Sequence, residues 1–131
     1  MIEESLIATL LDLPSRRTRQ HFLEKHQSKV SVHVLAELER RANRLRLEAP
    51  GQAIQAATVL VHVADFLKDE RARADGLRIK GNLLLYQGRC RESISLYRKA
   101  REIYAHCGDD MGIARLQVGW TWALKDLACY D

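Results

Sequence analysis

Residues 76–110 read GLRIKGNLLLYQGRCRESISLYRKAREIYAHCGDD, and this stretch decides the fold. Its apolar residues recur at helical spacing on both sides of Gly88, which predicts two helices joined by a tight turn. Small residues stand where two such helices would touch, and large apolar residues stand one turn away. The small residues are Gly81, Ser93 and Ala100, and the large ones are Leu77, Leu84 and Tyr97. We therefore expect two antiparallel helices that approach closely at Gly81.

The whole chain has the composition of one helical domain. It contains 131 residues, of which 47% are hydrophobic and 29% charged, with two prolines and seven glycines. A chain of this size builds one core rather than two, and few of its residues interrupt helices. Its longest apolar stretches are far shorter than the roughly 20 residues of a membrane span. Three widely spaced cysteines do not predict a disulfide framework. We expect an all-α protein in the cytoplasm.

Helical periodicity, caps and breakers predict about seven helices. The expected helices run from the N-terminus to about Leu13, from Ser15 to about His26, from Ser28 or Ser31 to a sharp end at Pro50-Gly51, from about Gln52 to Leu67, from Asp69 to Gln87, from Gly88 to Cys107, and from Asp109 or Asp110 onward.

The paired helices around Gly88 resemble the tetratricopeptide repeat (TPR), whose consensus places large and small residues in this order. The chain departs from the consensus at Lys80, where the family usually carries Leu, and at Ser93, where it usually carries Ala. The resemblance implies antiparallel helix pairs stacked as a right-handed superhelix, which holds partner proteins and carries out no chemistry. An ordinary helical bundle with coincidental small residues is the alternative.

Similar spacing elsewhere in the chain predicts further repeats. Ser93, Tyr97 and Ala100 have an earlier counterpart with the same internal spacing in Ala57, Val61 and Ala64. Gly81 has a later counterpart in Gly119, and Trp122 then stands where Leu84 stood. The expected organisation is a leader or cap over residues 1–32, a degenerate repeat over 33–68, a clear repeat over 70–107 and half a repeat over 109–131.

If Gly119 is the counterpart of Gly81, the last half repeat should turn near Asp126 and leave one helix face uncovered. Trp120 and Trp122 are two residues apart and so cannot share a helix face. We expect Trp122 to pack onto the preceding helices and Trp120 to lie in a groove or interface. The open face predicts self-association, or an N-terminal fragment of a longer protein.

The N-terminal stretch LLDLPSRRTRQHFLEKHQ, followed by two helices, resembles the leader before the TPRs of bacterial proteins that end in a caspase-like CHAT protease domain. The resemblance implies a signalling or protease-linked parent protein, with the catalytic residues outside this chain.

No metal, cofactor or catalytic site is predicted. His21 and His26 point to different sides of a helix, and no two ligand pairs have the spacing of a zinc site. Cys90 and Cys107 lie in no nucleophile motif, and the glycines form no phosphate-binding loop. We expect a protein that is not an enzyme.

Binding to a protein or peptide is the function that the resemblance implies. In a TPR the first helix of each repeat lines the concave surface, and Arg78 and Asn82 hold the inward positions here. They resemble half of the carboxylate clamp that holds a peptide C-terminus. Ile113 and Gln117 stand where its other basic residues would be, so the full clamp is absent. The expected groove residues are Arg78, Asn82, Tyr86, Gln117 and Trp120.

A helical domain that associates with nucleic acid, such as part of a transcription regulator, is the rival interpretation. The formal net charge is +4, and arginines cluster at residues 16–19, 40–46 and 71–73. Basic clusters of this kind attract phosphates. Acidic residues are interleaved with them, however, and arginines at helical spacing usually form a solvated face.

Overall fold

The computed structural model describes the backbone of residues 2–130 and the side chains of residues 3–125. All regular elements of this part of the chain are helices, so the predicted all-α class with about seven helices is confirmed. The helices are α1 (Ile2–Asp12), α2 (Arg16–Lys25), a short 3-10 helix η1 (Gln27–Lys29), α3 (Val32–Leu45), α4 (Pro50–Phe66), α5 (Glu70–Tyr86), α6 (Cys90–Cys107) and α7 (Asp110–Tyr130). None of the described helices is both long enough and apolar enough to cross a bilayer.

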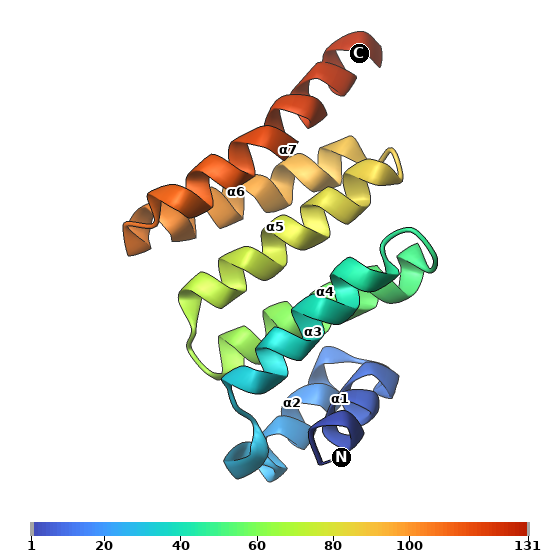
Figure 1. The fold of residues 1–131 in the computed structure, drawn as a ribbon. Helices are drawn as coiled ribbons and strands as arrows, with labels where there is room; N and C mark the ends of the chain where they lie inside the picture. The colour runs from blue at the N-terminus through green and yellow to red at the C-terminus, as the bar shows by residue number, and fades with distance from the viewer. Residues whose placement is uncertain (1, 131) are drawn as a thin grey trace.

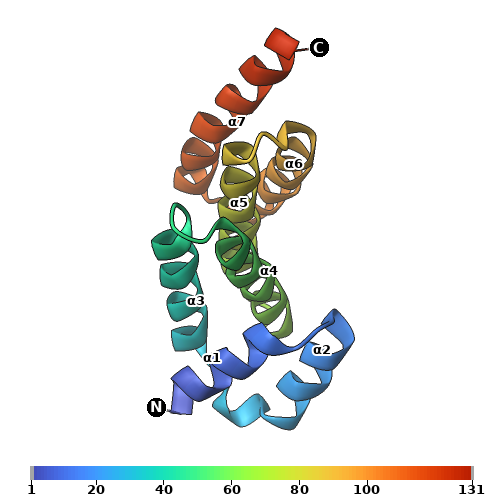
Figure 2. The same ribbon diagram turned by 90° about the vertical axis from the view of Figure 1, so that its right-hand side faces the viewer.

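The helices form an open stack with the two termini at opposite ends (Figure 1). From α3 onward, each helix packs against the next one in the chain. In Figure 2, α3 and α7 lie on the left, α4 lies to the right of α3, and α5 stands between α7 and α6. Helix α5 also contacts both α3 and α7 directly. These three helices therefore form a continuous side of the molecule.

Two clusters of buried side chains hold the stack together. The first joins α1 and α2 to α3, α4 and part of α5, and includes Ile7, Leu10 and Leu23. The second joins α5, α6 and α7 around Tyr97 and Tyr104. The buried apolar side chains described within residues 3–32 therefore belong to the same core as those of α3 and α4.

Local sequence explains most of the helix boundaries. Ser15 accepts a hydrogen bond from the Thr18 amide, and the Thr18 hydroxyl accepts one from the Ser15 amide, which makes a reciprocal cap at the start of α2. Pro50 was predicted to end the third helix. The structure instead places Pro50 at the first position of α4, where the missing amide proton of proline costs nothing. The predicted turn near Asp126 is also wrong, because α7 continues to Tyr130.

The close approach predicted at Gly81 is confirmed. A β-carbon built on Gly81 would lie 2.6 Å from the Tyr97 ring, so only glycine fits here without movement. The Ser93 hydroxyl donates to the Gly81 carbonyl oxygen at 2.8 Å. Tyr97 and Leu84 are buried, as their spacing predicts. The contact fixes the position along α5 and α6 at which the two helices pack against each other.

The corner between α4 and α5 recurs between α6 and α7. Lys68 and Gly108 both adopt positive φ, at 58° and 69°. Asp69 and Asp109 follow them, and both backbone amides donate to the carbonyl five residues earlier. Both carboxylates accept from the amide three residues later and so cap the following helix. The corner between α5 and α6 has the same positive φ and backbone bond, at Gly88 and Arg89, but lacks a side-chain cap. The aspartate cap therefore sets Lys68 in correspondence with Gly108.

The buried positions of α4 and α6 match with the same displacement along the chain. They are Ala53, Ala57, Leu60 and Ala64 in α4, and Ser93, Tyr97, Ala100 and Tyr104 in α6. We call this alignment the corner register. In the corner register Ala57 corresponds to Tyr97, and Gly81 corresponds to Thr121. The pairings predicted from the sequence, of Ala57 with Ser93 and of Gly81 with Gly119, are therefore wrong.

Candidate binding face

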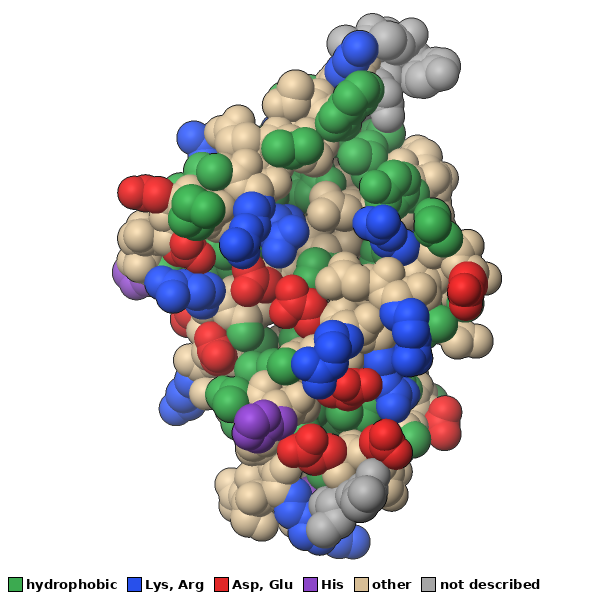
Figure 3. All heavy atoms as spheres, in the orientation of Figure 1, with side chains coloured by type: hydrophobic (Ala, Val, Ile, Leu, Met, Phe, Trp, Pro, Cys, Tyr) green, Lys and Arg blue, Asp and Glu red, His purple; other side chains and the backbone are tan. Residues whose placement is uncertain are grey.

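Two helical stripes on the side formed by α3, α5 and α7 make the candidate site. The residues of each stripe follow one another at three- or four-residue spacing and so share a helix face. The stripe on α5 consists of Arg71, Asp75, Arg78, Asn82 and Tyr86, and that on α7 of Met111, Arg115, Val118, Trp122 and Lys125. We call these residues the α5–α7 face. Figure 3 shows this side of the molecule, with hydrophobic side chains gathered in its upper part, over α7.

The two stripes are neighbours that face the same way. Helices α5 and α7 are in contact, and Arg71 Nε lies 3.3 Å from Asp109 Oδ2 at the start of α7. A β-carbon on Gly119 would lie 2.6 Å from Asn82 Oδ1. The corner register also pairs the stripes position by position, since Asn82 of α5 corresponds to Trp122 of α7.

Two tyrosines of α6 reach through to the α5 stripe and fix its polar side chains. Tyr104 Oη donates to Asp75 Oδ1 at 2.5 Å, and Arg78 Nε donates to Tyr104 Oη at 3.2 Å. Tyr97 Oη donates to Asn82 Oδ1 at 2.6 Å. Burial raises the pKa of both tyrosines, which therefore stay protonated and act as donors. Side chains held in this way lose little entropy when they bind a ligand.

The α7 stripe is apolar in its middle and exposed. Met111, Val118 and Trp122 are 66%, 64% and 55% accessible to solvent. The Lys125 ammonium lies 5.1 Å from the centre of the Trp122 ring, within the range of a cation–π contact. Grouped apolar side chains of this size on one side of a helix are typical of surfaces that bind partners.

The roles predicted for the two tryptophans are reversed in the structure. Trp122 was expected to be packed, but more than half of it is exposed. Trp120, expected in the groove, is half-buried against α6, with its ring 6.4 Å from that of Tyr97 and 5.7 Å from the Arg101 guanidinium carbon. The reason is the packing of α7, which turns Leu116, Trp120 and Ala123 toward the cluster around Tyr97 and leaves Trp122 outside it.

The other predicted groove residues divide between two helices. Arg78, Asn82 and Tyr86 lie together on α5, where Arg78 is mostly buried by its partners and Tyr86 is 71% exposed. Gln117 is exposed on α7, beside Val118. The exposed apolar residues of α7 were missed, although Met111, Val118 and Trp122 follow a helical spacing that could have revealed them.

Several arginines of the clusters are paired within the molecule. Arg16 pairs with Asp65, Arg40 and Arg41 with Glu37, and Arg73 with Glu70, at distances of 2.8–3.4 Å. Hydrogen bonds from Arg40 and Arg41 lower the pKa of the Glu37 carboxyl. Internal pairing leaves these clusters less positive charge to offer a phosphate backbone.

A buried histidine that the sequence interpretation did not single out joins α2 to α4. Arg19 Nε donates to His62 Nδ1 at 3.3 Å, so the ring proton is on Nε2, which donates to Gln20 Oε1 at 2.8 Å. Burial, together with the charges of Arg16 and Arg19, lowers the pKa of His62 from 6.5 to about 4. The imidazole is therefore neutral at pH 7 and serves as a structural bridge.

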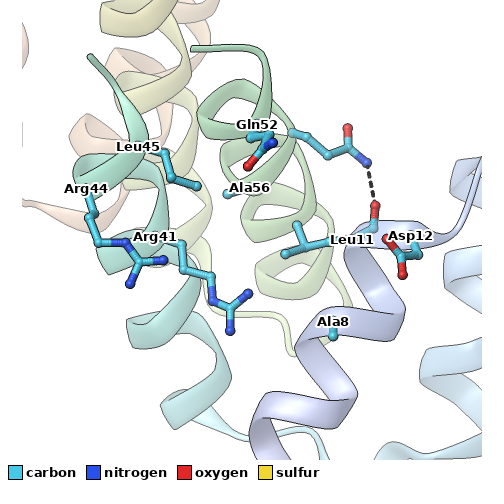
Figure 4. Close-up of a pocket in the computed structure, with 9 residues that line it drawn as sticks. Ala8, Leu11, Asp12, Arg41, Arg44, Leu45, Gln52 and Ala56 are labelled. Carbon is cyan, nitrogen blue, oxygen red and sulfur yellow. Dashed lines mark hydrogen bonds between the residues drawn. The ribbon is translucent and has the colours of Figure 1, made fainter. Parts of the chain in front are cut away.

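Apart from this face, a hollow of about 460 Å³ lies between α1, α3 and α4 (Figure 4). Arg41 and Arg44 line it from α3, Asp12 from α1, and Gln55 from α4. Its polar groups are of both signs, and Gln55 is already bonded to the Leu11 carbonyl oxygen. Within the described residues, no three His, Cys, Asp or Glu side chains gather closely enough to hold a metal ion.

No family model, no curated protein and no solved structure matches this chain.

Proposed function

We propose that this protein is a non-catalytic, TPR-like interaction module whose α5–α7 face binds a segment of another protein. The observation that carries the proposal is the exposed apolar stripe of Met111, Val118 and Trp122 beside the tethered polar stripe of Arg78 and Asn82. An apolar surface with a few fixed polar groups beside it has the composition of a specific protein-binding site.

The TPR-like part of the proposal is supported by the packing of the helix pairs. The contact of Gly81 with Ser93 and Tyr97 lies at the positions that the TPR resemblance implies. The corner that recurs at Lys68 and Gly108 also favours a repeated helix pair. The resemblance of the N-terminal stretch extends the proposal to a bacterial signalling or CHAT-protease-linked parent protein in the cytoplasm.

Selection of peptides from a displayed random library tests the binding function without assuming the chemistry of the ligand. The immobilised protein should enrich peptides that bind with a Kd of about 1 mM or tighter, an affinity of about 4 kcal/mol. Binding of the enriched peptides should be lost with Trp122→Ala, because this removes the largest exposed apolar group of the face. It should be retained with Leu47→Ala, because Leu47 is 77% exposed between α3 and α4, outside the face. Peptides that bind both variants equally would place the binding surface elsewhere and overturn the proposal.

A further inference from the structure

Four residues of the α7 stripe, which we call the α7 strip, have a simple charge pattern. Arg115, Val118, Trp122 and Lys125 follow one another at spacings of three, four and three residues, so they share one narrow strip of the helix. The two basic residues, both exposed, stand at the ends of this strip, and the two apolar residues stand between them. The basic residues are ten positions apart, or about 15 Å along a helix.

Among the residues whose side chains the structure describes, no acidic residue forms an ion pair with Arg115 or Lys125. Asp75 is occupied by Tyr104 and lies 3.9 Å from Arg78. Asp109 pairs with Arg71 and caps α7. The positive charge of Arg115 and Lys125 therefore remains available to a ligand, and the ligand that matches it carries negative charge at both ends.

A second copy of this chain does not fit the strip. In an antiparallel pair that brings Val118 against Trp122 of the other copy, Arg115 meets the other copy's Lys125. A parallel pair sets each residue against itself, so Arg115 meets Arg115 of the other copy. Both arrangements bring like charges together, which is unfavourable at an interface.

A helix matches the strip better than an extended segment or a nucleic acid. Residues at helical spacing on a partner present apolar groups at the same three- and four-residue intervals as α7, as in the binding of helices to grooves. A single nucleic acid strand would use the cations and stack on Trp122, but Val118 and Met111 offer it neither charge nor an aromatic ring.

We infer that the α7 strip binds an amphipathic α-helix of a partner protein, with acidic residues about ten positions apart and apolar residues between them. The inference rests on the proposed binding function and names the chemistry of the partner. Carboxylates of the partner pair with Arg115 and Lys125, and its apolar residues cover Val118 and Trp122. Tyr86, the last residue of α5, is also 71% exposed.

Matched synthetic peptides test the charge pattern directly. The acidic peptide is a helix of about 18 residues, about 27 Å long, with two glutamates about ten residues apart and leucines between them at helical spacing. The basic peptide has lysines in place of both glutamates, and a broken peptide has a proline in the middle of the acidic sequence. Binding is measured by fluorescence anisotropy of labelled peptides to the full chain. The acidic peptide should bind at least about tenfold more tightly than the other two.

Charge reversal on the protein should reverse this preference. Arg115→Glu with Lys125→Glu should bind the basic peptide at least about tenfold more tightly than the acidic one. The matched control is Arg98→Glu with Lys99→Glu, which makes the same change in net charge at exposed positions of α6 and should keep the preference of the natural chain. Circular dichroism melting checks that each variant is folded.

Each other outcome overturns the inference in a recognisable way. Binding of the basic or the broken peptide as tightly as the acidic one would contradict the inference that the partner is an acidic helix. The proposed binding function would still be supported if Trp122→Ala abolished that binding. Tighter binding of an oligonucleotide of about 20 nucleotides, lost on charge reversal, would assign the face to nucleic acid. A dimer in sedimentation that Val118→Glu dissociates would assign it to a second copy. Failure of these peptides and of the displayed library together would overturn the proposed function as well.

Discussion

Gly119 of α7 lies so close to Tyr97 of α6 that a β-carbon built on the glycine would stand 2.6 Å from the tyrosine oxygen. A β-carbon built on Gly81 of α5 would stand 2.6 Å from Cε1 of the same ring. One buried tyrosine therefore occupies the space that two glycines on different helices leave open. Its hydroxyl also donates to Asn82 on the α5–α7 face. The packing of three helices thus positions a side chain of the candidate site.

The first prediction concerns this close approach. Gly119→Ala should lower the free energy of unfolding by about 1–3 kcal/mol, because the added methyl group forces Tyr97 or Asn82 to move in a packed region. Gly51→Ala is the matched control. Gly51 lies in the first turn of α4 with nothing within 4 Å of an added β-carbon, so alanine there should be neutral or stabilise by up to about 1 kcal/mol. Urea denaturation measures both, and equal effects would mean that the Gly119 contact is not tight.

The second prediction separates the two tryptophans. Trp120→Ala should destabilise the fold by about 1–3 kcal/mol, because the half-buried indole stacks on Tyr97. Trp122→Ala should change stability by less than about 0.5 kcal/mol, because the side chain is largely exposed. Thermal and urea denaturation of the two variants test the order. A larger loss for Trp122→Ala would restore the pairing of Trp122 with Leu84 predicted from the sequence.

The sequence predicts the contacts between α5 and α6 correctly and the alignment of α7 with α5 incorrectly. Gly81, Ser93 and Tyr97 were placed together correctly because small and large residues alternate at helical spacing within one helix pair. The register failed because Gly81 and Gly119 were taken as equivalent positions of two repeats. In the structure both glycines contact Tyr97. Spacing alone cannot distinguish two equivalent positions from two neighbours of one ring.

The residues of the α5–α7 face follow from the sequence only in part. The side of α5 on which Arg78, Asn82 and Tyr86 lie follows from the way α5 packs on α6, which the sequence of the clear repeat predicts. The apolar half of the face depends on which side of α7 remains uncovered, and only the packing of α7 on α6 decides that. His62 was missed because it stands in the apolar run TVLVHVADF, where nothing local reveals that Arg19 and Gln20 lie opposite.

The third prediction concerns pH. The pKa of His62 is about 4 in the folded chain, against a usual 6.5, so the unfolded chain binds its proton more readily. The stability that the neutral imidazole contributes is therefore fully present above about pH 6.5 and is lost as the pH falls toward 4. One pKa unit corresponds to about 1.4 kcal/mol, so the full loss is about 3 kcal/mol.

Comparison with His62→Gln isolates this effect from the titration of the carboxyl groups. Glutamine can accept from Arg19 and donate to Gln20, and it does not titrate between pH 4 and 7. The free energy of unfolding of the natural chain should exceed that of the variant at pH 7, and the difference should shrink by pH 4.5. A difference that is constant across this range would show that His62 does not gain a proton on unfolding.

The fourth prediction concerns the hydrogen bonds that join Tyr104 of α6 to the α5–α7 face. Tyr104→Phe removes the hydroxyl that donates to Asp75 and accepts from Arg78, and leaves both groups with an unmet partner. The expected loss of stability is about 1–3 kcal/mol, because the site is largely shielded from water. Tyr86→Phe is the matched control, because Tyr86 is 71% exposed and its hydroxyl can bond to water in either state. Urea denaturation should therefore show a loss for Tyr104→Phe alone, whereas similar small effects for both variants would mean that the Tyr104 hydroxyl does not hold Asp75 and Arg78 in place.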